Sequence, residues 1–419
     1  MSDYMFMLEN HLTSAQNRVV AEVQRVAAEA NVHLFLTGGA VRDMFGGFPI
    51  RDLDFTLEGP ALKLAKSIAD NLGAEVVYSD ASRKITELVS PEGVTFEISM
   101  ARTEKYTKTG AKPQVAPATI HEDLRRRDFT INAIALSLNR ASRGLLVDPV
   151  NGMGDLQSKE IRSTNSYVFY ASPVRLLRLT RFRVRMGFTI AERTVSQIRN
   201  AREAQAEEHI TREELLRELR QAANEPNIAD LLQAWDEDGV LKLVTPGLKG
   251  EALNIATFQK LQKFRESLPF GLDLGGDQAA VFFALIAENL AAKDKAAVAD
   301  LDSAHSPSWL KLATRAAKLE KEIAAPSMQK ASKIYALLSN APGEQITYLA
   351  LRSTQRVVQE RIKNYLTKHV PAAQEITDLQ VIEAGYTLGT PKFERAKADM
   401  IAKRLDARPK KPEPEAEIA

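Results

Sequence analysis

The sequence has no cysteine among its 419 residues, and this absence excludes several kinds of chemistry. Disulfide bonds, thiolate nucleophiles, zinc ribbons and iron–sulfur clusters all require cysteine. No apolar run approaches the ~20 residues that a membrane-spanning helix needs. The first residues, MSDYMFMLENHL, lack the basic start and the cleavage site of a signal peptide. We therefore expect a cytoplasmic protein with no membrane contact.

The sequence also lacks a strong excess of charge of either sign. The formal net charge is +2, with 44% hydrophobic and 26% charged residues. This composition supplies enough apolar material for folded cores, and the length suggests two to four domains. Any affinity for nucleic acid must then come from local clusters of basic side chains.

Hydrophobic periodicity divides the chain near residue 150. Before it, helical and strand patterns are mixed, whereas helical patterns dominate after it. The predicted helices of the first part lie over 11–30 and 61–73, and its predicted strands over 32–37, 74–79, 84–90 and 94–101. Strand 94–101 places Val94, Phe96, Ile98 and Met100 on one face and Thr95, Glu97 and Ser99 on the other, as in a hairpin with one polar face. We predict an α/β head over 1–148, followed by an all-α neck over 149–205, body over 206–330 and tail over 331–407, with a disordered end over 408–419.

A glycine pair and two aspartates form the first chemical cluster. Gly38-Gly39 follow a predicted strand and precede a helical stretch, AVRDMF, whose first turn carries Arg42 and Asp43. The N–H groups at such a helix start bind phosphate well. In RDLDFT, the strand period of two places Asp52 and Asp54 on one face. Paired carboxylates are ligands for Mg²⁺, and two such ions can activate a hydroxyl and stabilise leaving pyrophosphate.

An isolated D-x-D pair is more often a loop with two solvated aspartates, but the combination GG-x-V-R-D and R-D-x-D is far more specific. Walker and Rossmann glycine patterns are both missing here. The segment resembles the head of the class II tRNA nucleotidyltransferase and bacterial poly(A) polymerase family. That resemblance implies a polymerase-beta-like fold with a mixed sheet. It also implies that Gly38, Gly39, Arg42 and Asp43 bind the nucleotide, and that Asp52 and Asp54 are catalytic residues that hold two Mg²⁺ ions.

Two further clusters extend the resemblance. Glu97, alone a solvated strand residue, matches a third catalytic carboxylate near the metals. Residues 126–133, RRDFTINA, match the family letter for letter, which implies that Arg126, Asp128, Thr130 and Asn132 contact the sugar and phosphates. From the residues alone, the three consecutive arginines at 125–127 suggest a solvated basic face. The polar residues that follow would lie inside an apolar helix.

Arginines recur at spacing three from residue 175. Arg175, Arg178 and Arg181 would form a basic stripe on a helix, which is either simply exposed or binds phosphates and base edges. The family has E-D-x-x-R here, whose aspartate and arginine read the base. This chain keeps Arg175 and, beside it, Arg178, but has Ala171 and Ser172 in place of the acids. A serine hydroxyl donates as well as accepts, so base selection is expected to be relaxed unless Glu213 or Glu214 supplies the acceptor.

The resemblance runs nearly end to end and implies a metal-dependent, template-independent RNA nucleotidyltransferase. It would add CCA, or its terminal nucleotides, to the 3′ end of tRNA from CTP and ATP, because the tail resembles that of the tRNA-binding members. Two alternatives stay open: a poly(A) polymerase or A-only adding enzyme, and a non-catalytic RNA-binding protein with a decayed site. The sequence does not identify a protein partner.

Overall fold

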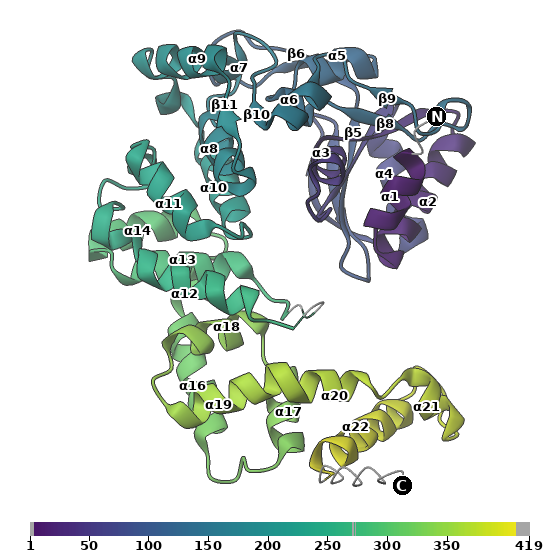
Figure 1. Cartoon of the computed structure of the whole chain (residues 1–419), viewed down its shortest axis with the longest axis vertical. Coiled ribbons are helices and arrows are strands. Elements are labelled where there is room, and N and C mark those ends of the chain that lie inside the picture. Colours follow the sequence, from purple (N-terminus) through teal and green to yellow (C-terminus); the bar gives the residue numbers. More distant parts are fainter. Residues whose placement is uncertain (1–3, 270–271, 273, 408–419) are drawn as a thin grey trace, which may run out of the picture. The chain divides into compact units, whose positions relative to one another are not determined.

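The structure is a computed structural model that describes residues 4–269, 272 and 274–407. The chain separates into two compact units, the first ending at Glu218 and the second beginning at Leu219. All strands of the described residues belong to the first unit (Figure 1). The finer division into head, neck, body and tail remains a prediction.

A seven-stranded sheet forms the centre of the first unit, in the order β3-β4-β5-β2-β1-β8-β9. Strands β2 and β5 pair in parallel and the other neighbours pair antiparallel, so the sheet is mixed as expected. Two further strands, β6 (Arg102–Lys105) and β7 (Gln114–Pro117), form a separate hairpin. The strands of the large sheet are β1 (His33–Thr37), β2 (Leu53–Glu58), β3 (Glu75–Asp80), β4 (Ile85–Val89), β5 (Thr95–Met100), β8 (Ala135–Ser137) and β9 (Leu146–Val147).

The predicted amphipathic elements occur where the periodicity places them. Helices α2 (Ser14–Glu29) and α4 (Ala61–Leu72) pack against each other, and α4 also contacts β4 and β5. Helix α4 ends at Gly73, which adopts a left-handed conformation with φ +63°. The apolar residues of the 94–101 strand are buried, as the alternation predicts. A short helix, α1 (Tyr4–His11), precedes α2.

Two local predictions are wrong. Helix α3 (Gly38–Gly46) begins at the glycine pair itself, so Arg42 and Asp43 lie in its second turn rather than its first. The stretch 121–136 is not one apolar helix, because α5 (Ile120–Arg125) ends within the arginine run. Phe129 then forms a bridge with Ser163, and a single turn over Thr130–Asn132 leads into β8. Tertiary pairing of this segment with the sheet outweighs its helical pattern.

The turn after β9 satisfies its own polar groups with hydrogen bonds inside the turn. Asp148 accepts hydrogen bonds from the backbone N–H groups of Gly152 and Met153, at 2.7 and 2.9 Å. A Cβ on Gly152 would lie 2.1 Å from the carbonyl oxygen of Thr130, so only glycine fits. The following helices of the unit are α6 (Gly152–Ser158), α7 (Val168–Ala171), α8 (Arg175–Met186), α9 (Glu192–Glu203) and α10 (Arg212–Ala222), with a small β10–β11 pair (Glu160–Ile161 and Thr189–Ile190).

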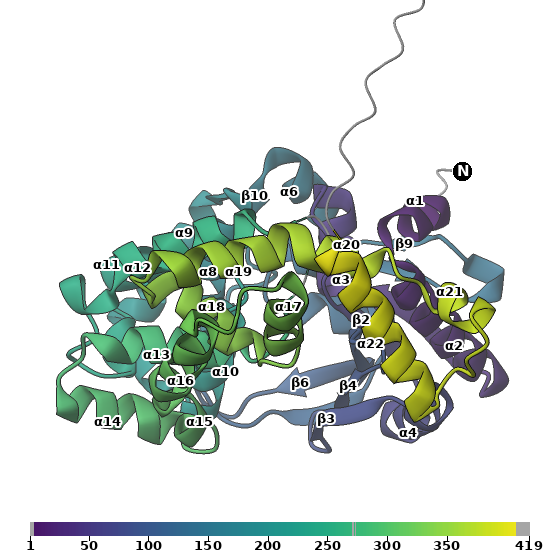
Figure 2. The same cartoon turned by 90° about the horizontal axis from the view of Figure 1, so that it is seen from below.

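The described residues of the second unit form helices and connecting loops, which confirms the all-α prediction for this part of the chain. The β10–β11 pair lies inside the predicted all-α neck and departs from that prediction. Helices α21 and α22 pack together near the C-terminus, joined by a turn in which Gly385 and Gly389 have positive φ (Figure 2). The predicted disordered segment lies outside the described residues. The helices are α11 (Ile228–Glu237), α12 (Ile255–Glu266), α13 (Gln278–Glu288), α14 (Ala292–Leu301), α15 (Ser306–Leu310), α16 (Leu312–Ala324), α17 (Ala331–Ser339), α18 (Gly343–Arg352), α19 (Arg356–Asn364), α20 (Val370–Gln374), α21 (Asp378–Glu383) and α22 (Pro391–Asp406), with a π-helical turn over Tyr365–His369. Within the described chain, no helix has the length and apolar character needed to cross a membrane.

Candidate active site

Acidic side chains line one face of the sheet. Asp54 on β2 stands directly opposite Glu97 on β5, and Glu87 on β4 stands opposite Glu97 from the other side. Asp52 lies just before β2, which begins at Leu53 and is therefore shorter than predicted. The alternation still holds, since Leu53 is buried while Asp52 is exposed and Asp54 half-buried.

The glycine pair touches this group of carboxylates, Asp52, Asp54, Glu87 and Glu97, which we call the acidic edge. The backbone N–H of Gly39 donates a 3.1 Å hydrogen bond to Oδ2 of Asp54. Gly38 has φ +62°, and a Cβ on it would lie 2.9 Å from the same oxygen. The left-handed conformation and the lack of space both require glycine here. The structure thus brings the predicted phosphate-binding turn and one predicted metal ligand into contact.

The carboxylates of this edge repel one another. Burial, together with the negative charges of Asp54 and Glu87, raises the pKa of Glu97 to about 7. The pKa of Asp52 is also raised, because the protein removes water from part of its carboxylate and because Asp54 is nearby. A cation between these groups would relieve the repulsion.

The donor chemistry of this edge fits a divalent metal ion. Among the described residues, no three acidic or histidine side chains are already arranged closely enough to hold one. Asp52, Asp54 and Glu97 nevertheless offer hard carboxylate oxygens with too little compensating positive charge, the donors that Mg²⁺ prefers.

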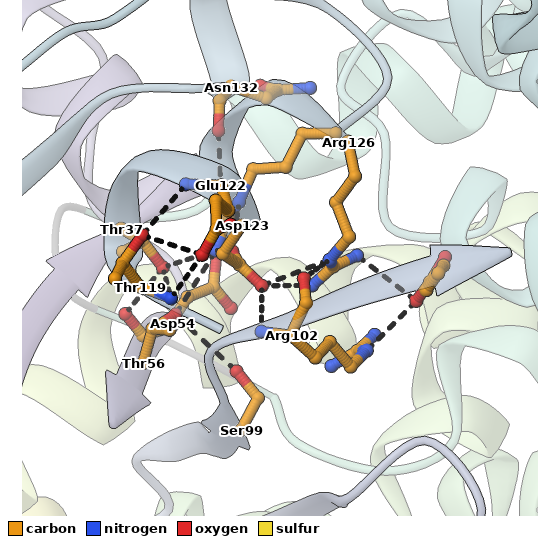
Figure 3. Close-up of polar contacts among 12 residues, drawn as sticks. Thr37, Asp54, Thr56, Ser99, Arg102, Thr119, Glu122, Asp123, Arg126 and Asn132 are labelled. Atoms are coloured by element: carbon orange, nitrogen blue, oxygen red, sulfur yellow. Dashed lines mark hydrogen bonds and ion pairs between the residues drawn. The ribbon is translucent and has the colours of Figure 1, made fainter. Parts of the chain in front are cut away.

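A second acidic cluster beside this edge is neutralised by arginines. Asp123 is fully buried and accepts hydrogen bonds from the backbone N–H of Arg102, at 3.1 Å, and from the guanidinium group of Arg126 (Figure 3). The guanidinium group of Arg127 donates to the same carboxylate at 3.0 Å. Glu104 accepts from Arg102 at 2.9 Å and from Arg126 at 3.1 Å. Burial would raise the pKa of Glu104, but these arginines lower it to about 2.

The arginine nearest the glycine turn is Arg127, which the sequence reasoning did not select. Its Nη2 donates to the hydroxyls of Thr37 and Thr56, each at 3.1 Å, and its Nη1 would lie 3.0 Å from a Cβ on Gly38. The RRD triplet signalled an arginine here without showing which one faces the sheet. Glu87 was also missed, although it is a polar residue at mid-strand in KITELVS.

The predicted nucleotide-binding residues around α3 form one buried network. Arg42 donates to Oδ1 of Asn132 at 2.6 Å and pairs with Asp43 at 2.8 Å. Asn132 donates to Oδ1 of Asp128 at 3.0 Å. Asp43 in turn pairs with Arg185 at 2.7 Å. Thr130 lies apart from this chain of contacts and donates to Asp155 at 2.6 Å. The structure brings Arg42, Asp43, Asp128 and Asn132 together.

The three arginines of the predicted basic stripe on α8 all have partners within the first unit. Whether the stripe binds phosphates or bases remains a prediction. Arg178 is exposed but pairs with Asp128 at 3.0 Å. Arg175 donates to the carbonyl oxygens of Val168 and Arg126, at 3.3 and 3.2 Å. Arg181 is buried and pairs with Glu218 at 3.0 Å. Helical spacing identifies the shared face, but Asp128, Glu218 and the carbonyl of Arg126 reach it from outside α7 and α8.

Ala171 and Ser172 lie where α7 ends and α8 has not yet begun, and both are half-buried. Both of the predicted substitute acceptors already have partners. Glu213 pairs with Arg217 at 3.5 Å, and Glu214 accepts from the backbone N–H of Thr211 at 3.1 Å.

The mixed sheet, the glycine turn against Asp54 and the following helices define the class of the first unit as a polymerase-beta-like nucleotidyltransferase head. Residues 34–162 match the model of the poly A polymerase head domain. The chain is 40% identical over 196 residues to an A-adding tRNA nucleotidyltransferase of Halalkalibacterium halodurans, covering 46% of each chain. It is 30% identical over 342 residues to that of Aquifex aeolicus, covering 80% of this chain and 40% of the relative.

A solved structure of a CCA-adding enzyme in an apo form is 26% identical, with a TM-score of 0.55 over 98% of this chain and 96% of that chain. The chain spans less than half the length of the two curated relatives. Residues 34–162 thus form a poly A polymerase head domain, and the chain is similar to tRNA nucleotidyltransferases over most of its length.

Proposed function

We propose that this protein transfers nucleotides from CTP and ATP to the 3′ end of tRNA, adding CCA or its terminal nucleotides. The observation that carries the proposal is the contact between the Gly38-Gly39 turn and Asp54, beside Glu97. Transfer of a nucleotidyl group needs a turn that binds phosphate next to carboxylates that can hold metal ions, and here the two are in contact.

In this proposal Asp52 and Asp54 hold two Mg²⁺ ions with help from Glu97, and the ions supply Lewis-acid stabilisation of the phosphates. The N–H groups at the start of α3 receive the triphosphate. Arg42 is held by Asn132 and Asp43, so it contributes positive charge from a fixed position. Arg127, fixed by Thr37 and Thr56, adds a second charge beside Gly38. Preorganised charges of this kind avoid reorganisation during the reaction.

Base recognition is assigned to the region of Arg175. The family resemblance implies that Arg175 and Arg178 face the base, and the ion pair with Asp128 holds Arg178 in place. Arg175 donates to two carbonyl oxygens, which a base would have to replace. Binding would therefore require a local rearrangement of Arg175, at the junction of α7 and α8.

A-only addition is the second candidate, and the printed names of the two curated relatives favour it. The CCA-adding structure favours the first candidate, because it matches over nearly the whole of both chains. The two are separated by a nucleotide-by-nucleotide extension assay on tRNA ending before CCA and on tRNA ending in CC. Incorporation of CTP and then ATP supports CCA addition, whereas ATP incorporation on the CC-ending substrate alone supports A-only addition.

The same assay tests the proposal as a whole. No incorporation of either nucleotide on either tRNA, by folded protein supplied with Mg²⁺, would leave the non-catalytic RNA-binding alternative. Affinity for tRNA should fall steeply with salt, since phosphate contacts by basic residues release counterions. A dissociation constant that does not change with salt would contradict binding through phosphates.

A further inference from the structure

A row of four polar side chains crosses the sheet at the acidic edge. Tyr78 on β3 stands opposite Glu87, Glu87 opposite Glu97, and Glu97 opposite Asp54. Directly opposite residues project from the same face, and like charges in such pairs are destabilising. Glu87 therefore adds negative charge next to Glu97, although the proposed reaction gives Glu87 no task.

Arg217 on α10 meets the far end of this row. Its guanidinium lies 4.7 Å from the centroid of the Tyr78 ring, in a cation–π arrangement. Its Nη2 is 3.5 Å from Oε1 of Glu213, and the residue is half-buried. Burial raises the pKa of Glu87, and the positive charge of Arg217 opposes that rise. Helix α10 therefore places a cation within electrostatic range of the carboxylates without a direct ion pair to Glu87.

We propose that Arg217 is a positioning residue that sets how tightly the acidic edge binds a divalent cation, acting through Tyr78 and Glu87. This inference rests on the proposed function, because it takes the edge to be the metal site. Arg217 competes with the cation for the negative potential of the row, while Glu87 strengthens that potential. Tyr78 fixes the distance of the Arg217 guanidinium from the carboxylates. The affinity for the cation is therefore set by the opposing effects of Arg217 and Glu87.

The opposing charges predict effects of opposite sign, which a merely structural role would not produce. In the nucleotide-free full chain, Arg217→Gln should lower the dissociation constant for Mn²⁺ about three- to tenfold, and Glu87→Gln should raise it by a similar factor. Arg217→Lys keeps the charge and should bind Mn²⁺ nearly as the wild type does. The double variant of Arg217→Gln and Glu87→Gln should fall between the single variants.

Electron paramagnetic resonance of free Mn²⁺ measures this affinity directly. In transfer assays, the Mg²⁺ concentration for half-maximal rate should shift in the same directions, with kcat at saturating Mg²⁺ unchanged. Arg199→Gln on α9 and Glu75→Gln on β3 are matched controls, because both residues are exposed and lie outside the row. Thermal unfolding identifies any variant that fails to fold. In that case Tyr78→Leu, which frees the guanidinium, should still lower the dissociation constant.

Shifts of the same sign in Arg217→Gln and Glu87→Gln, or no shift in either, would overturn the inference. Asp54→Asn separates this failure from failure of the proposed function. If the wild type binds Mn²⁺ and Asp54→Asn does not, the metal edge stands and only the role of Arg217 is lost. If the folded wild type binds no Mn²⁺, both proposals are wrong.

Discussion

Glu97 and Glu104 stand on consecutive strands, β5 and β6, but their surroundings treat the negative charge in opposite ways. Burial and two neighbouring acids raise the pKa of Glu97 to about 7, whereas arginines lower the pKa of Glu104 to about 2. Asp54 belongs with Glu97, and Asp123 belongs with Glu104. In the part of the chain that the structure describes, Asp54 and Glu97 form no ion pair, whereas the arginines that neutralise Glu104 and Asp123 are part of the fold.

The greatest loss of activity is expected at the acidic edge, whose carboxylates have too little compensating positive charge. Asp52→Ala or Asp54→Asn should reduce nucleotide transfer by at least about a thousandfold, because metal charge stabilisation supplies several kcal/mol at the transition state. Single-nucleotide extension of tRNA measures the loss. Stability in urea should be unchanged or slightly higher, since each variant removes a repelling charge. Turnover close to that of the wild type would remove both aspartates from the metal site.

The cluster of Asp123 and Glu104, which arginines neutralise, should instead lose stability when an acid is removed. Asp123→Asn leaves Arg126 and Arg127 without their buried partner and should cost about 3–5 kcal/mol of the free energy of unfolding. Urea denaturation monitored by circular dichroism measures it. Glu122→Gln on the same helix is the control, because Glu122 is exposed and pairs with no arginine in the structure described here. Equal stability of the two variants would contradict the distinction between the clusters.

Base selection should depend on the two acidic residues that Ala171 and Ser172 replace at the α7–α8 junction. Ala171→Glu combined with Ser172→Asp should improve the preference for CTP and ATP over UTP and GTP about ten- to a hundredfold. A charge-assisted hydrogen bond to the exocyclic amine is worth ~1.5–3 kcal/mol. Competition assays with all four nucleotides give the ratios. If the unmodified protein already rejects UTP as strongly as the double variant, the alignment at Ala171–Arg175 is wrong.

The smallest expected effect is the pH dependence of Glu97. Its folded pKa lies above that of an unfolded glutamate, so the folded protein binds the proton more tightly. Without metal, the stabilising contribution is present below pH 4.5 and is lost as the pH rises toward about 7. Glu97→Gln should remove this loss, roughly 1–2 kcal/mol between about pH 5 and 7.5. Urea unfolding at both pH values measures it, and equal slopes in both proteins would contradict the prediction.

Glu104 supplies the contrast in sign. Because its folded pKa is depressed to about 2, its contribution is present above pH 4.5 and is lost as the pH falls through about 2. Glu104→Gln should therefore weaken the protein at neutral pH but not at very low pH, as urea unfolding at the two extremes would measure. Together, the two glutamates give opposite slopes of stability against pH within one head.

Local patterns along the chain predicted the elements with a clear hydrophobic period and the residues with a distinctive spacing. The alternation of 94–101 fixed which face of β5 is buried, and Gly73 ended α4, because side-chain direction and glycine freedom are local properties. The run GG-x-V-R-D with R-D-x-D pointed to a phosphate turn beside carboxylates, and Gly39 does contact Asp54.

Which charges remain without a partner of opposite sign depends on contacts between distant segments of the folded chain. The strand register places Glu87 beside Glu97, and the fold brings Glu104 and Asp123 to Arg126. It also covers the arginine stripe of α8 with Asp128 and Glu218. Spacing along the chain shows which residues share a face, but the potential at a carboxylate depends on charges from distant segments. The sequence therefore identified acids and arginines without showing which of them neutralise one another.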